Sequence, residues 1–125
     1  MKRIVAALAI LIIVFGSAIW IYSEIVFKIN SLTEMASAIQ DSVNDRGSTD
    51  SEETEMLSES WSKAENLMVS FLPHSELDDI EIGIMNIKNY HEQGLTDEYL
   101  EELNNCINRL NHIKESEKPT IKNIF

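Results

Sequence analysis

A run of nineteen residues without a charged side chain, from Ile4 to Tyr22, directly follows Lys2 and Arg3 at the start of the chain. As an α-helix this run is about 28 Å long at 1.5 Å per residue, close to the ~30 Å hydrocarbon core of a bilayer. A chain with such a segment is expected to be held at a membrane. We therefore predict a transmembrane helix over residues 4–22.

A cleaved secretory signal peptide is the alternative interpretation of this run. The small residues Gly16, Ser17 and Ala18 would suit signal peptidase, and cleavage after Ala18 would release a soluble domain. The apolar run nevertheless continues through Trp20 and Tyr22 without a polar stretch, and these two residue types are typical of a membrane–water interface. An uncleaved anchor is the favoured interpretation.

The charges on either side of the run predict its orientation. Both basic residues before it lie at positions 2 and 3, and the first charge after it is Glu24. By the positive-inside rule, residues 1–3 are expected in the cytoplasm and residues 23–125 outside it. The protein is thus predicted to cross the cell membrane once.

The region after the run is strongly acidic. All 21 acidic residues follow the run but only 8 of the 10 basic residues do, so residues 23–125 carry a formal charge of −13. A surface this acidic repels phosphate backbones, which argues against nucleic-acid binding. The single cysteine, Cys106, excludes an internal disulfide, and its place on an apolar stripe predicts a core residue.

Apolar residues recur every three or four positions in this acidic region, which predicts helices. The expected helices cover residues 24–44, 52–72, 75–93 and 97–115, and the first continues the transmembrane helix as one rod. Nearly equal lengths and short connections are typical of an antiparallel, up-down-up-down four-helix bundle. The predicted fold class is therefore all-α, with a transmembrane helix continuing into such a bundle.

Apolar stripes on these helices are predicted to form the core. The second helix is expected to begin with a capping box of Asp50 and Glu53 and to end at Pro73. The expected caps of the third and fourth helices are Ser75 and Thr96. The predicted stripes consist, in chain order, of Tyr22, Ile25, Ile29, Leu32, Ala36, Ile39 and Val43; Leu57, Trp61, Ala64, Met68 and Phe71; Leu77, Ile80, Ile84, Ile87 and His91; and Tyr99, Leu103, Cys106, Leu110 and Ile113.

Several short segments resemble a known family. They are Trp61 with Ala64, the segment His74-Ser-Glu-Leu-Asp-Asp-Ile80, and the ending Glu117-Lys-Pro-Thr-Ile-Lys-Asn-Ile-Phe125. Together with the N-terminal anchor, they resemble small bacterial membrane-anchored proteins catalogued as domain of unknown function 4363. The resemblance covers nearly the whole chain. It implies a single-pass partner of another membrane protein in the bacterial cell membrane, such as the small multi-pass family typified by YetF, and it implies no activity.

The strongest candidate metal site lies just after Pro73. The imidazole of His74 and the carboxylates of Glu76, Asp78 and Asp79 are groups that bind divalent metals. At about 100° per residue these side chains fan around a helix, which suits compensation of the helix dipole better than shared coordination. We therefore predict no metal site and no cofactor.

Catalytic motifs are not found in the sequence. Its three histidines, one cysteine and four glycines form no hydrolase motif and no phosphate-binding loop, so no enzyme activity is predicted. Apolar residues outside the stripes are more informative. Contacts with a partner are predicted at Ile82 and Met85. Ile121, Ile124 and Phe125 in the tail are further candidates for such a contact, although closing the end of the bundle is the favoured role of the tail.

Two functions from different classes fit these observations. The favoured one is an interaction protein whose anchored bundle assists or regulates another membrane protein. The alternative is an extracytoplasmic sensor that binds a ligand or a metal, which would need a convergent polar pocket. A homodimer through the first helix is also open, because the spacing of its stripe fits a coiled coil.

Overall fold

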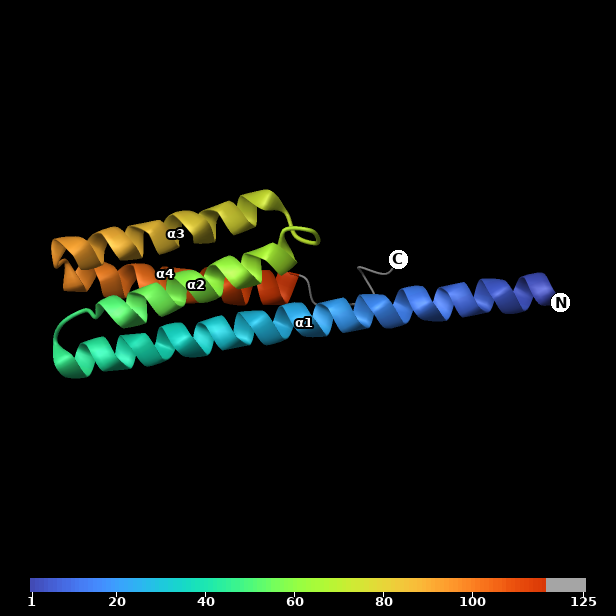
Figure 1. Ribbon diagram of the computed structural model, residues 1–125, viewed down its shortest axis with the longest axis horizontal. Helices are drawn as coiled ribbons and strands as arrows, with labels where there is room; N and C mark the ends of the chain where they lie inside the picture. The colour runs from blue at the N-terminus through green and yellow to red at the C-terminus, as the bar shows by residue number, and fades with distance from the viewer. Residues whose placement is uncertain (117–125) are drawn as a thin grey trace.

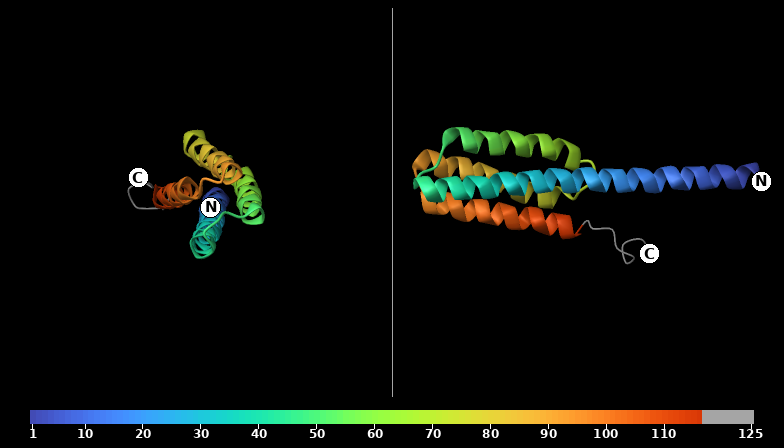
Figure 2. Two further views of the ribbon diagram at one scale, coloured as in Figure 1. Left: turned by 90° about the vertical axis from the view of Figure 1, so that its left-hand side faces the viewer. Right: turned by 90° about the horizontal axis from the view of Figure 1, so that it is seen from below.

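The computed structural model describes residues 1–116 of the chain, which form four helices. They are α1 (Lys2–Arg46), α2 (Ser51–Met68), α3 (His74–Gln93) and α4 (Thr96–Ser116), and residues 1–116 contain no strand. Consecutive helices run in opposite directions (Figure 1). Both α1 and α3 pack against α2 and α4, so the four helices form a ring (Figure 2). The predicted antiparallel four-helix bundle is confirmed.

Helix α1 is one unbroken rod of 45 residues, roughly 67 Å long at 1.5 Å per residue. Its first half projects alone from the bundle, and its second half forms one wall of it (Figure 1). The helix continues through Ser23, and Ile25 is its first buried residue. The predicted continuity between the apolar run and the first helix of the bundle is therefore confirmed.

The core consists largely of the predicted stripes. All six apolar residues expected after Tyr22 in α1 are buried, as are all five expected in α4. In α2 and α3 the helical spacing also buries two small residues, Thr54 and Gly83. The largest fully buried side chains are Trp61 and Tyr99.

Helix α2 begins as its sequence predicts. The Asp50 side chain accepts a hydrogen bond from the backbone N–H of Glu53 at 3.0 Å, and the Asp50 backbone oxygen accepts one from the Thr54 hydroxyl at 2.7 Å. The Glu53 carboxylate pairs with Arg46 at 2.6 Å, across the loop that joins α1 to α2. Asp50 is therefore the N-cap, and Glu53 ties the start of α2 to the end of α1.

The end of α2 differs from the prediction, because the helix stops at Met68 and not at residue 72. The backbone N–H groups of Phe71 and Leu72 both donate to the Met68 carbonyl, at 3.0 and 2.9 Å, so the chain tightens into a turn. Leu72 is buried in the core, whereas Phe71 is 48% exposed. The prediction that Phe71 is a core residue is wrong, because the helical period ends before it.

The predicted cap of α3 is also wrong. Pro73 occupies the N-cap position with φ −59° and ψ 135°, and α3 has no side-chain cap. The first helical hydrogen bond runs from the Leu77 N–H to the Pro73 carbonyl at 3.5 Å. Because the helix begins at His74, Ser75 already lies inside its first turn and is not its cap.

The two ends of the bundle differ in their surroundings. The α2–α3 turn (residues 69–73) and the described end of α4 lie at the end from which the first half of α1 projects, which we call the near end (Figures 1 and 2). The loops at Gly47 and Gly94 lie at the opposite, far end, where both glycines have positive φ. The predictions for Ile121, Ile124 and Phe125 lie outside the described residues.

Candidate functional site

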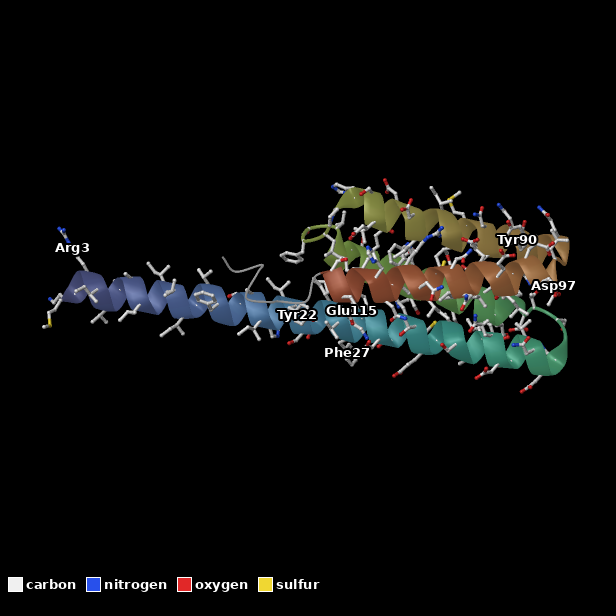
Figure 3. The ribbon with its side chains drawn as sticks, turned by 180° about the vertical axis from the view of Figure 1, so that it is seen from behind. Arg3, Tyr22, Phe27, Tyr90, Asp97 and Glu115 are labelled. Atoms are coloured by element: carbon white, nitrogen blue, oxygen red, sulfur yellow. The ribbon has the colours of Figure 1, made fainter. Side chains whose placement is uncertain are left out.

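The first half of α1 is the largest uncovered apolar surface of the described chain. Every side chain from Ile4 to Trp20 is exposed, and α1 is long and apolar enough to cross a membrane. Figure 3 shows Arg3 near the free end of this segment and Tyr22 where the bundle begins. Soluble monomers rarely leave apolar patches larger than a few hundred Å² exposed. This segment therefore indicates a membrane or another apolar environment.

A smaller apolar patch lies on the outer surface of α3. Ile82 and Met85 are each 55% exposed. They are three residues apart, so their side chains are neighbours on one helical face. The flanking positions on this face, Asp78 and Asn89, are exposed and polar. The structure thus brings together the two predicted contact residues of α3 and leaves them uncovered within residues 1–116.

Phe27 is an exposed aromatic residue that the sequence analysis missed. It is 65% exposed, and Figure 3 shows it on the outer side of α1, pointing away from the other three helices. Its position two residues after Ile25 places it about 200° around the helix from that buried residue. An aromatic residue opposite a buried stripe is the signal that could have identified it.

The acidic segment at the start of α3 does not converge on one point. His74, Asp78 and Asp79 are exposed, and Glu76 is partly buried. Within residues 1–116 there is no group of three or more histidine, cysteine or acidic residues that could hold a metal ion. His74, Glu76, Asp78 and Asp79 therefore form no such group in this part of the chain.

A groove of about 220 Å³ lies between the start of α3 and the end of α4. It is lined by Glu76, Asp79, Asn108, Arg109, His112 and Ile113. Arg109 donates hydrogen bonds to the Asp79 backbone carbonyl at 3.3 Å and to the Glu102 carboxylate at 3.4 Å. One carboxylate oxygen of Glu76 is buried without a hydrogen-bond partner. The groove thus has polar side chains at its edge but a lining surface that is mostly apolar.

Cys106 is buried in the contact between α3 and α4, as predicted. Burial raises the pKa of its thiol to about 11, and the nearby Glu102 adds to this effect. The reactive form of cysteine is the thiolate, so a thiol with this pKa is a poor nucleophile at neutral pH. Cys106 is therefore a buried core residue, and its thiol is a poor nucleophile.

The polar contacts at the far end hold the helices together. The Thr54 and Tyr99 hydroxyls share a hydrogen bond of 2.7 Å inside the bundle, and burial raises the pKa of Tyr99. Thr49 and His91 Nδ1 are 2.5 Å apart, and the His91 ring meets the Tyr99 ring edge-on with centroids 6.5 Å apart. His91 thus lies in a structural contact at the end of the bundle.

A pair of carboxyl groups lies between α2 and α3. The Trp61 indole N–H donates to Glu81, which lies beside Glu65. Desolvation raises the pKa of Glu65, and its hydrogen bond and charge interaction with Glu81 raise it further, as does the charge of Asp78. We therefore expect the α2–α3 contact to depend on pH through Glu65.

Comparison with known proteins places the chain in a family. The family model for "Domain of unknown function (DUF4363)" matches residues 19–124. The chain belongs to the DUF4363 family. Its match begins at Ile19, inside the projecting half of α1, and includes the whole described bundle. None of the curated proteins and none of the solved structures matches this DUF4363 chain.

Proposed function

We propose that this DUF4363 protein is a single-pass membrane protein whose bundle contacts another membrane protein and assists or regulates it. The observation that carries the proposal is the uncovered apolar half of α1, which continues without a break into a wall of the bundle. A rigid connection of this kind holds the bundle at a constant height above the bilayer. Such a placement suits a partner in the same membrane, and no catalytic role is proposed.

The proposed orientation follows from the charges. Lys2 and Arg3 precede the span and the acidic bundle follows it, so the N-terminus lies in the cytoplasm and the bundle outside it. The proposed location is a bacterial cell membrane. The resemblance described above suggests a multi-pass protein of the YetF-like family as the partner.

Three exposed apolar residues, at two places on the surface, support a contact role for the bundle. Ile82 with Met85 forms a patch on α3, and Phe27 stands on the outer side of α1. The stripe of α1 is covered by α2 and α4, so a homodimer through α1 would use the exposed side that carries Phe27.

A ligand-binding sensor is the second candidate, and the groove between α3 and α4 is the observation that favours it. Its volume of about 220 Å³ is below the ~300–1,000 Å³ of typical small-molecule sites. A second groove of about 460 Å³ lies between α1 and α4, but it is wide open to solvent. Neither groove encloses a ligand, which makes the interaction role the better-supported proposal. Calorimetry with zinc, manganese and calcium tests the sensor, and heat of binding that disappears in Glu76→Gln would favour it.

Orientation is tested by labelling single cysteines in intact cells with a membrane-impermeant maleimide. In a Cys106→Ala background, Ser48→Cys lies in the exposed far-end loop and is expected to react. A cysteine inserted between Met1 and Lys2, which keeps both basic residues, is expected to react only after lysis. The reverse pattern would contradict the proposed orientation, and reaction of both in intact cells would contradict the span.

The contact role is tested by crosslinking in native membranes followed by purification of the DUF4363 protein. We expect the double variant Ile82→Lys/Met85→Lys to lose most of a crosslinked membrane protein that the unmodified chain retains. The matched control, Ser62→Lys/Asn104→Lys, adds the same charge at exposed polar positions of α2 and α4 and should retain it. Equal recovery with both variants would remove the α3 patch from the proposal.

A further inference from the structure

The α2–α3 turn presents apolar side chains to solvent at the near end of the bundle. Val69 and Phe71 are both exposed there. The turn extends beyond the described end of α4 toward the projecting half of α1 (Figures 1 and 2). An exposed aromatic residue at the tip of a turn costs solvation free energy in water, so its position relative to the membrane segment is informative.

The near end lies level with the point where the predicted membrane span ends. Ile21 packs against the core and Ile25 is buried in it, so the bundle begins beside residues 21–25 of α1. The predicted span ends at Tyr22. A bundle that begins at this level rests directly on the membrane–water interface.

We propose that the α2–α3 turn inserts Val69 and Phe71 into the lipid interface and forms a second membrane contact beside α1. This inference rests on the proposed membrane anchoring. The apolar surface of the turn contacts the bilayer in which α1 is embedded, because this bilayer surrounds the apolar half of the same helix.

The distribution of charge supports a lipid contact at this turn. Residues 66–75 contain no Asp, Glu, Lys or Arg and have His74 as their one titratable side chain, although the region after the span has 21 acidic residues. Charged residues flank this stretch at Glu65 and Glu76, and Glu115 lies near the described end of α4, at the same end of the bundle (Figure 3). Because charged side chains are costly to move into hydrocarbon, only the tip of the turn enters the interface, to the shallow depth of about 5–10 Å that is typical of interfacial segments.

The turn is held firmly enough to act as a fixed contact. Leu72 is buried, and the N–H groups of Phe71 and Leu72 donate to the Met68 carbonyl. Pro73 restricts φ at the entrance to α3. Phe71 is therefore exposed by the path of the backbone and not by a loose segment. Together with α1, the turn stops the bundle from rotating about the axis of the rod.

Depth-dependent fluorescence quenching in nanodiscs tests this contact on the full chain. Bimane is attached in a Cys106→Ala background at Ser70→Cys in the turn, at Ala18→Cys in the apolar half of α1, or at Ser48→Cys in the far-end loop. Lipids carry doxyl quenchers at carbon 5, near the head groups, or at carbon 12. For insertion of 5–10 Å, we expect 5-doxyl lipid to quench the label at position 70 at least about twofold more than the label at position 48.

The role of the two apolar side chains is tested by Val69→Ser/Phe71→Ser with the label kept at position 70. Quenching should fall to the level of the far-end control, while circular dichroism shows an unchanged helix content. Persistent quenching in this variant would overturn the role of the two side chains.

The label at position 18 separates failure of this inference from failure of the anchor. A quenched label at position 18 with an unquenched label at position 70 would overturn the second contact and leave the anchor in place. This is also the result expected if the turn binds a partner protein and not lipid. An unquenched label at position 18 would overturn the membrane span and the contact together.

Discussion

Gly83 and Cys106 lie at a close approach of α3 to α4. A Cβ atom added at Gly83 would lie 2.7 Å from the Cys106 sulfur and 3.1 Å from a Glu102 carboxylate oxygen. Contacts under 3.0 Å require one helix to shift or the cysteine to change rotamer. The absence of a side chain at Gly83 therefore sets the spacing of these two helices.

Whether Gly83→Ala raises or lowers the free energy of unfolding should depend on Cys106. In the unmodified chain we expect it to lower the free energy of unfolding by about 1–3 kcal/mol through overpacking. In a Cys106→Ala background the sulfur is gone, and the remaining close atoms, on Glu102 and Arg109, are ends of flexible side chains that can move. Alanine should then stabilise the helix by up to about 1 kcal/mol relative to glycine. Urea denaturation of the four variants measures this coupling. Equal effects in both backgrounds would show that the sulfur does not limit the spacing.

The Glu65 pair predicts a pH dependence of stability. The pKa of Glu65 is raised in the folded protein, which means that folding favours the protonated carboxyl group. The resulting contribution to the free energy of unfolding is fully present below the pKa of Glu65 in the unfolded chain. This stability is lost as the pH rises through the folded pKa. We expect Glu65→Gln to stabilise the bundle at pH 7 by less than about 1 kcal/mol, because the pair is partly screened by solvent.

Thermal unfolding at pH 4 to 7 checks this prediction. The advantage of Glu65→Gln over the unmodified chain should grow as the pH rises. Glu59→Gln is the matched control, because Glu59 is an exposed carboxylate on the same helix. A pH profile of Glu65→Gln that parallels the control would contradict the assignment.

Helix ends account for both the successes and the errors at the level of elements. Asp50 was recognised because an N-cap uses a local side-chain bond to the backbone N–H of Glu53, three residues ahead. The end of α2 was missed because Met68 to Leu72 has no glycine and keeps an apolar pattern, while the backbone turns so that Leu72 reaches the core. The spacing of residues in the sequence therefore predicts the start of a helix better than its end, because the end depends on packing.

The N-cap of α2 can be tested by substitution. Asp50→Ala should lower the free energy of unfolding by about 0.5–2 kcal/mol, since it leaves the Glu53 N–H without its partner. Asp50→Asn should retain most of the stability, because asparagine also accepts this bond. Chemical denaturation followed by Trp61 fluorescence gives both values. An Asp50→Asn variant as unstable as Asp50→Ala would point to the charge as the cause.

The whole molecule is expected to behave as one rigid body on its membrane rod. Spin labels at Ala18→Cys and Asp45→Cys lie 27 residues apart on exposed positions of α1, so their backbones are separated by about 40 Å. Pulsed electron spin resonance in nanodiscs should give one narrow distance distribution near this value. Three glycines inserted after Ser23 should broaden it. A broad distribution in the chain without the insertion would show that α1 bends between membrane and bundle.

The candidate contact surfaces were predictable only in part. Ile82 and Met85 were identified because they depart from the apolar period of their own helix. Phe27 departs from its stripe in the same way but was overlooked. Helical spacing predicts that Phe71 is in the core. This prediction fails because the exposure of Phe71 depends on the path of a turn and not on helical spacing.

The sequence by itself determined the properties that depend on neighbours along the chain. These are the apolar rod, the helical stripes, the acidic surface and the membership of the DUF4363 family. Only the tertiary structure decided which groups from different helices meet, such as Gly83 with Cys106 and Glu65 with Glu81. It also left Phe71 exposed in the α2–α3 turn, whose place beside the end of the span follows from the antiparallel topology. These outcomes depend on distances between helices, and the apolar period of a single helix gives no information about such distances.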